Sequence, residues 1–156
     1  MGAQVRALAD NGKLRQHSFK VLLLEDNAID ARWVARGLKQ SGGSKYDLHV
    51  LDMVDSVESY LARNPVDVIV MDLNLPDSHG WHTVRQIADA KPGVPIVVLS
   101  GQADFDTVRE ALLAGAQTYQ IKDIGSQESL AERIEFAIQR KSREIELAKK
   151  FIALPL

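Results

Sequence analysis

The sequence predicts an α/β fold in which a parallel sheet of five strands carries five helices on its two faces. Short apolar runs alternate with segments of helical spacing, and this alternation repeats five times along the chain. Several of the apolar runs are continuous and rich in β-branched residues, which is typical of strands buried on both faces of a parallel sheet. Because parallel neighbours need crossover connections, we expect helices on both faces of the sheet.

Each predicted strand is a short, mainly apolar segment. The first is the continuous run Val-Leu-Leu-Leu at residues 21–24, and the second, at 48–51, alternates apolar and polar side chains. The third and fourth, at 66–73 and 95–99, are again continuous, and the fifth, at 118–121, is the weakest. Glycine, proline and asparagine at turn positions separate successive elements.

The five predicted helices alternate with these strands, and each has apolar residues at helical spacing. They cover residues 28–40, 54–62, 81–90, 105–114 and 129–151. In the same order they are marked by Val34 with Leu38, Val57 with Leu61, Val84 with Ile87, Val108 with Leu112, and Leu130 with Ile134. The last pattern continues to Ile152, which predicts an extended C-terminal helix.

The composition favours a single domain and excludes several classes of function. The chain has 156 residues, with 19 Lys and Arg against 21 Asp and Glu, and this balance argues against a nucleic-acid or anionic-membrane binder. The absence of cysteine rules out disulfides, thiol catalysis and cysteine-ligated metals. No apolar run approaches the roughly 18 residues of a membrane span, and the first residues lack the apolar core of a signal peptide. We therefore expect a cytoplasmic protein with no direct nucleic-acid or membrane partner.

Chemically active side chains gather where the predicted strands end. In open parallel sheets, ligands bind at the carboxyl ends of the strands. Glu25 and Asp26 end the first strand, Asp72 the third, Ser100 the fourth and Lys122 the fifth. Two carboxylates about 4 Å apart repel by roughly 4 kcal/mol at an effective dielectric near 20, so the group favours a divalent cation beside the lysine. A carboxylate held in this way is suited to attack phosphorus, because phosphoryl transfer needs mainly positioning and charge stabilisation.

Five separated motifs, in this order, resemble the receiver domain of two-component response regulators. They are the acidic pair Glu25-Asp26, the segment MDLNLPDSHG, the hydroxyl in VVLSG, Gly115-Ala116, and YQIK ending in Lys122. The resemblance covers about residues 20–140. It implies a flavodoxin-like, doubly wound sheet of strand order 2-1-3-4-5 and a phosphorylation-controlled signalling switch, not a metabolic enzyme.

The resemblance also implies a set of acidic site residues. Asp72 would accept the phosphoryl group from a phosphohistidine donor, on a histidine kinase or a histidine phosphotransfer protein. Asp26 and Asp72 would bind Mg²⁺ or Mn²⁺, with Glu25 acting through water and Asn74 contributing its main-chain carbonyl. No glycine-rich phosphate loop is present, so we expect no nucleotide cofactor.

The remaining implied residues form the switch. Lys122 would pair with the phosphoryl group, Ser100 would move towards it, and Tyr119 would move inward behind it. The change would be read on the face formed by helix four, strand five and helix five. Family members usually have proline after this lysine, often with a cis bond. Here the residue is Asp123, for which a cis bond costs about 2.5–4 kcal/mol, so we expect it to be trans.

The expected organisation is an N-terminal extension at 1–18, the receiver domain at 19–140 and a C-terminal helical extension at 141–156. The extension continues a seam with coiled-coil-like spacing, which indicates either a solvated helix, a homodimer contact or a connection to an output domain. The regulated partner would be a downstream protein or a fused output domain.

Two other functions fit parts of the pattern. A receiver-fold interaction or dimerisation module that signals without phosphate would be expected to lack a site residue, and none is missing here. A haloacid-dehalogenase-like phosphatase would need a second aspartate two residues after the nucleophile, where this chain has Asn74, and an acidic pair late in the chain, where Glu25-Asp26 comes early.

Overall fold

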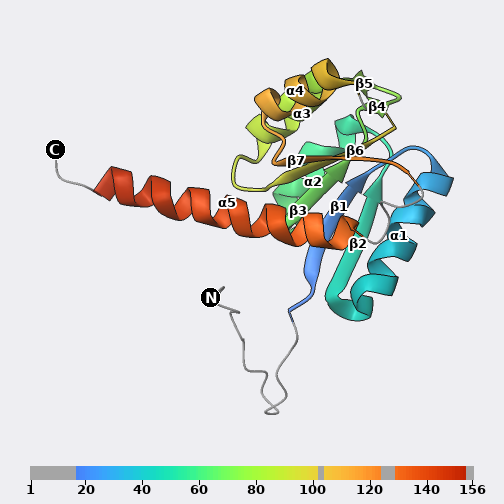
Figure 1. Cartoon of the computed structure of the whole chain (residues 1–156), viewed down its shortest axis with the longest axis horizontal. Coiled ribbons are helices and arrows are strands. Elements are labelled where there is room, and N and C mark those ends of the chain that lie inside the picture. Colours follow the sequence, from blue (N-terminus) through green and yellow to red (C-terminus); the bar gives the residue numbers. More distant parts are fainter. Residues whose placement is uncertain (1–16, 102–103, 124–128, 154–156) are drawn as a thin grey trace, which may run out of the picture.

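The structure is a computed structural model that describes residues 17–101, 104–123 and 129–153. Within these ranges, one parallel sheet has the strand order β2-β1-β3-β6-β7, and a small antiparallel pair, β4-β5, lies outside it (Figure 1). The sheet strands are β1 (Phe19–Leu24), β2 (Tyr46–Leu51), β3 (Val68–Met71), β6 (Ile96–Ser100) and β7 (Thr118–Ile121). The α-helices are α1 (Ala28–Gly42), α2 (Val57–Arg63), α3 (Trp81–Ala90), α4 (Phe105–Ala114) and α5 (Leu130–Ala153). The order corresponds to 2-1-3-4-5 and confirms the predicted doubly wound fold.

Both faces of the sheet are buried. Successive side chains of each central strand point to opposite faces, and helices cover each face. Helices α1 and α5 cover one face, and α2, α3 and α4 cover the other. The first face buries Val21, Leu23, Val68, Val70, Val97 and Leu99, and the second buries Leu22, Leu24, Ile69, Met71, Ile96 and Val98. This division explains why the strands read as continuous apolar runs in the sequence.

The register of the sheet brings the carboxyl ends of its central strands together. Leu24, the last residue of β1, pairs with Leu51 of β2 and with Met71 of β3. The ladder continues one residue further on each side, since Glu25 N–H donates to Leu51 O (2.9 Å) and Asp72 N–H donates to Leu24 O (3.1 Å). Glu25 and Asp72 therefore leave the sheet from neighbouring strands at the same edge.

The third predicted strand is shorter than expected, and a hairpin follows it. β3 covers Val68–Met71 of the predicted 66–73, and the next residues form β4 (Asn74–Leu75) and β5 (Ser78–His79), which the sequence did not indicate. A turn at Pro76 and Asp77 joins the two short strands. Gly80 then adopts a φ of 69°, a conformation that suits glycine, and precedes α3.

The second predicted helix also differs at its start. A 3₁₀ turn, η2 (Val54–Ser56), precedes α2, and another, η1 (Gly43–Lys45), joins α1 to β2. Gly43 has a φ of 56° at the end of α1, a left-handed conformation that only glycine adopts at little cost. The helix boundaries otherwise follow the predicted ranges closely.

Helix α5 is a single helix of 24 residues and confirms the predicted extension. Its first turns are buried against the sheet through Leu130, Ile134 and Ala137, whereas Leu147 and Ile152 near its end are 42% and 86% exposed. The last turns project well beyond the rest of the domain (Figure 1). None of the helices in the described ranges combines the length and the apolar character needed to span a bilayer.

Candidate functional site

A cluster of charged side chains lies at the carboxyl edge of the sheet, centred on the ammonium group of Lys122. Lys122 directly follows β7, and its backbone N–H donates to Ser100 O at the end of β6 (2.9 Å). Its Nζ lies 2.7 Å from Glu25 Oε2, 2.7 Å from Asp72 Oδ2 and 2.9 Å from Asp30 Oδ2. Residues far apart in the sequence thus meet in one place, as the strand-end argument predicted for Glu25, Asp72 and Lys122.

Glu25 is held by the turn between β1 and α1. Its side chain is almost fully buried, and its second oxygen, Oε1, accepts a hydrogen bond from Asn27 N–H (3.1 Å). Asn27 is also the N-cap of α1, since its Oδ1 accepts from Ile29 N–H (2.9 Å) and Asp30 N–H (3.2 Å). The same turn therefore fixes the buried carboxylate and starts the helix that carries Asp30.

Asp72 is oriented by the loop that follows β3. Its Oδ1 accepts from Asn74 N–H (3.1 Å), which leaves Oδ2 for Lys122. The loop is tied down on both sides: Gly80 N–H donates to Leu73 O (2.8 Å), and the Asp77 carboxylate accepts from the backbone N–H groups of Val54 and Asp55 (3.0 Å each). The two hydrogen bonds to backbone N–H groups hold the pKa of Asp77 below its usual value.

The electrostatics of the cluster follow from burial and pairing. Burial alone would lower the pKa of Lys122, but its hydrogen bonds to Asp72, Glu25 and Asp30 outweigh that effect and raise the pKa above its usual value. Burial raises the pKa of Glu25, although the hydrogen bonds from Lys122 and Asn27 oppose that effect. At neutral pH the lysine is therefore charged, and it stabilises carboxylates that would otherwise repel one another.

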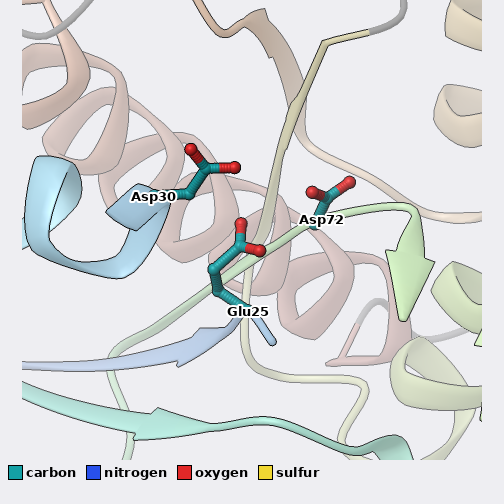
Figure 2. A group of neighbouring side chains, drawn as sticks. All are labelled: Glu25, Asp30 and Asp72. Atoms are coloured by element: carbon teal, nitrogen blue, oxygen red, sulfur yellow. The ribbon is translucent and has the colours of Figure 1, made fainter. Parts of the chain in front are cut away.

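The donor set suits a hard divalent cation. Glu25, Asp30 and Asp72 each offer a carboxylate oxygen, and the three oxygens lie within 4.8 Å of one another. Figure 2 shows these carboxylates, which come from the end of β1, the first turn of α1 and the end of β3. The ammonium of Lys122 contacts an oxygen of each of them, so a cation bound by the same three oxygens would require the ammonium to move. Carboxylate oxygens are the protein ligands that Mg²⁺ prefers.

The sequence-predicted metal ligands do not all enter this group. Asp26 and Asn74 are exposed, and neither belongs to the group of three, so their roles as metal ligands stay predictions. Asp30 was missed by sequence reasoning. A usable signal existed, because a carboxylate in the first turn of a helix that begins at a strand's carboxyl end points back towards that edge.

The two predicted switch residues lie on neighbouring strands. Ser100 is fully buried at the end of β6, and Tyr119 of β7 is partly buried and packs against the core. Burial raises the pKa of the Tyr119 phenol, while a hydrogen bond with the Ser100 side chain opposes that shift. The peptide bond between Lys122 and Asp123, both in the described part of the chain, is trans, as expected.

The sequence matches a known family over most of its length. The model of the response regulator receiver domain matches residues 21–135. The cell cycle transcriptional regulator CtrA of Caulobacter vibrioides is 31% identical over 121 residues, which are 78% of this chain and 51% of that protein. The chemotaxis protein CheY of Treponema pallidum is 31% identical over 117 residues, which are 74% of this chain and 80% of that protein. The chain thus spans about half the length of transcriptional regulators such as CtrA. These relatives are signalling proteins, and the match gives no support to the phosphatase alternative.

Solved structures share the fold. A CheY-like receiver domain protein from Methanospirillum hungatei superposes with a TM-score of 0.70 at 19% identity, over 82% of this chain and 99% of that chain. A response regulator from Burkholderia pseudomallei, solved with a phosphorylated aspartic acid and a calcium ion, gives a TM-score of 0.63 at 24% identity, over 89% and 77% of the two chains. At these identities the structures establish the common fold, and the sequence match carries the assignment. The chain belongs to the response regulator receiver domain family.

Proposed function

We propose that this receiver domain is a phosphorylation-controlled switch in which Asp72 accepts a phosphoryl group from a phosphohistidine donor. The observation that carries the proposal is the position of the Asp72 carboxylate, 2.7 Å from the Lys122 ammonium. Its side chain is 12% exposed, so the carboxylate can be reached from solvent while Lys122 holds it in place. Family membership supports the same role.

The transfer requires little covalent chemistry from the protein. An oxygen of the Asp72 carboxylate attacks the phosphorus, the bond from phosphorus to the donor imidazole nitrogen breaks, and that nitrogen keeps the electron pair. Lys122 lies where it can balance charge on the phosphoryl oxygens. Attack by water on the phosphorus later returns the carboxylate and inorganic phosphate, which resets the switch.

A divalent cation fits the oxygen-rich edge described above. Following the family motif, Asp26, Asp72 and the Asn74 carbonyl would hold it, with Glu25 acting through water. When bound, Mg²⁺ or Mn²⁺ supplies positive charge that allows the carboxylates and an anionic phosphoryl donor to approach one another.

The response would travel through residues that already touch the site. The acyl phosphate adds charge beside Lys122, whose backbone N–H is bonded to Ser100 O. Ser100 in turn contacts Tyr119 on β7. A shift of these residues favours one of two arrangements of α4, β7 and α5, and a partner binds the favoured one.

The proposed partners are a histidine kinase or phosphotransfer protein upstream and a cytoplasmic protein target or fused output domain downstream. Residues 141–156 form a proposed C-terminal extension, of which the structure describes the helical part to Ala153. Its exposed apolar side chains, which include Phe151 at 76% exposure, also make homodimerisation through this helix part of the proposal. The proposed N-terminal extension, 1–18, lies outside the described residues except for its last two.

The test is labelling by a small acyl-phosphate donor in the presence of Mg²⁺. We expect the wild-type chain to gain the mass of one phosphoryl group, and Asp72→Ala to gain none. Asp77→Ala, which removes a carboxylate from the same loop without touching Lys122, is the matched control and should still be labelled. Persistent labelling of the Asp72 variant, or no Mg²⁺-dependent labelling of the wild type, would refute the proposal.

A further inference from the structure

Each N–H donor of the Lys122 ammonium already has an acceptor in this structure. An ammonium group carries three N–H donors, and those of Lys122 are directed to the carboxylates of Glu25 after β1, Asp30 in α1 and Asp72 after β3. Glu25 and Asp72 belong to the motifs that define the family resemblance, whereas Asp30 does not. If Asp72 becomes phosphorylated, Lys122 has to share its donors with additional phosphoryl oxygens, so one existing contact must weaken.

We infer that Asp30 is the contact that gives way, and that it acts as a latch that holds Lys122 in the unphosphorylated arrangement. The inference deepens the proposed function and rests on it. The side chain of Glu25 is 2% exposed, and releasing it would leave a charge buried without a partner, which is strongly unfavourable. The side chain of Asp30 is 40% exposed, so water can solvate its carboxylate when Lys122 leaves.

The position of Asp30 also makes it oppose the phosphorylated state directly. An oxygen of the Asp30 carboxylate lies within 4.8 Å of an oxygen of the Asp72 carboxylate, and it is the Asp72 carboxylate that would carry the phosphoryl group. A phosphoryl group adds roughly one negative charge beyond that of the carboxylate it modifies. Asp30 therefore stabilises the resting state by holding Lys122, and it destabilises the phosphorylated state by repulsion. Because the Asp30 side chain is partly solvated, the lost contact with Lys122 and the repulsion together shift the equilibrium between the resting and the phosphorylated arrangement by about tenfold.

The test compares Asp30→Asn with the wild type in binding of beryllofluoride, a phosphoryl mimic, at saturating Mg²⁺. Asparagine keeps the shape and one oxygen acceptor but removes the charge. The Mg²⁺ affinity of each variant is measured separately, so that weaker cation binding is not mistaken for a change at Asp72. We expect Asp30→Asn to bind the mimic about tenfold more tightly. Binding is followed by the amide NMR spectrum, with Trp81 fluorescence as a second signal.

Glu58→Gln is the matched control. Glu58 is an exposed acidic residue in the first turn of α2, as Asp30 is in the first turn of α1, so its substitution controls for the loss of a helix-terminal charge. We expect this variant to bind the mimic as the wild type does. Unchanged or weaker binding by Asp30→Asn would overturn the inference, as would an equal increase in Glu58→Gln.

A structure of the wild-type chain with Mg²⁺ and beryllofluoride provides a second measurement. The inference requires the Lys122 ammonium to leave hydrogen-bond distance of Asp30 while it remains bonded to Glu25. If it leaves Glu25 instead, or keeps Asp30, the latch is refuted even though the switch itself stands. If the wild type binds no mimic at all, the proposed function fails, and the two failures are thus distinguished.

Discussion

The charge balance at Lys122 leads to a quantitative prediction about stability. Lys122→Met keeps most of the side chain's length and removes its charge. It leaves three carboxylates whose oxygens lie within 4.8 Å of one another, with Glu25 almost fully buried. Two unit charges at this separation repel by about 3.5 kcal/mol at an effective dielectric near 20. Removing one partner of a buried ion pair typically costs about 3–5 kcal/mol, so we expect Lys122→Met to lower the free energy of unfolding by about 3 kcal/mol at neutral pH.

The pH dependence of this loss has a definite sign. The pKa of Glu25 is raised in the folded chain, and removal of Lys122 raises it further. A carboxyl whose folded-state pKa exceeds its unfolded value contributes most to stability when it is protonated, and this contribution is lost as the pH rises through the folded-state pKa. The difference between Lys122→Met and the wild type should therefore be largest at about pH 8 and should shrink as the pH falls towards the usual carboxyl range, about pH 4.5.

Urea unfolding followed by circular dichroism, without divalent cations, measures the effect at both pH values. Lys45→Met is the control, because Lys45 pairs with Glu135 at the surface, where such pairs contribute about 0–1 kcal/mol. The double variant Lys122→Met/Glu25→Gln should regain part of the loss, since it removes the buried charge. A loss below about 1 kcal/mol, or a loss of the same size at both pH values, would show that the carboxylates are not held together by Lys122 as described.

Two further predictions concern the surroundings of the site. Asp77→Ala removes both acceptors for the N–H groups of Val54 and Asp55, so we expect a small but measurable loss of stability in thermal or urea unfolding, with phosphorylation retained; a loss of labelling would place Asp77 in the reaction itself. Truncation after Arg140 removes the exposed turns of α5 but leaves its buried residues, so it should reduce any dimer measured by sedimentation while the unfolding temperature changes little. An unchanged sedimentation profile would assign the extension no role in dimerisation.

The sequence was sufficient for the order of the elements because that information is local. Burial on both faces produces a continuous apolar run such as Val21–Leu24, and a helix that covers one face repeats its apolar residues at helical spacing. The hairpin of β4 and β5 escaped prediction because two-residue strands are too short to have a period. The third predicted strand, 66–73, is longer than β3 because burial alone does not distinguish a strand from a buried loop. Leu73 is buried but lies in the loop after β3.

For the site, the sequence by itself determined which charged residues end neighbouring strands, since parallel strands carry their last residues to one edge of the sheet. Only the tertiary structure decided which carboxylates face Lys122. The turn between β1 and α1 buries Glu25 and leaves Asp26 exposed. Asn27, the N-cap of α1, also accepts from Asp30 N–H, and the first turn of the helix brings the Asp30 carboxylate back to the edge. The place of Asp30 in the first turn of the helix indicates from the sequence that it lies near this edge. Which carboxylates reach the Lys122 ammonium depends in addition on the cap and on how the helix crosses the sheet, and the sequence pattern specifies neither.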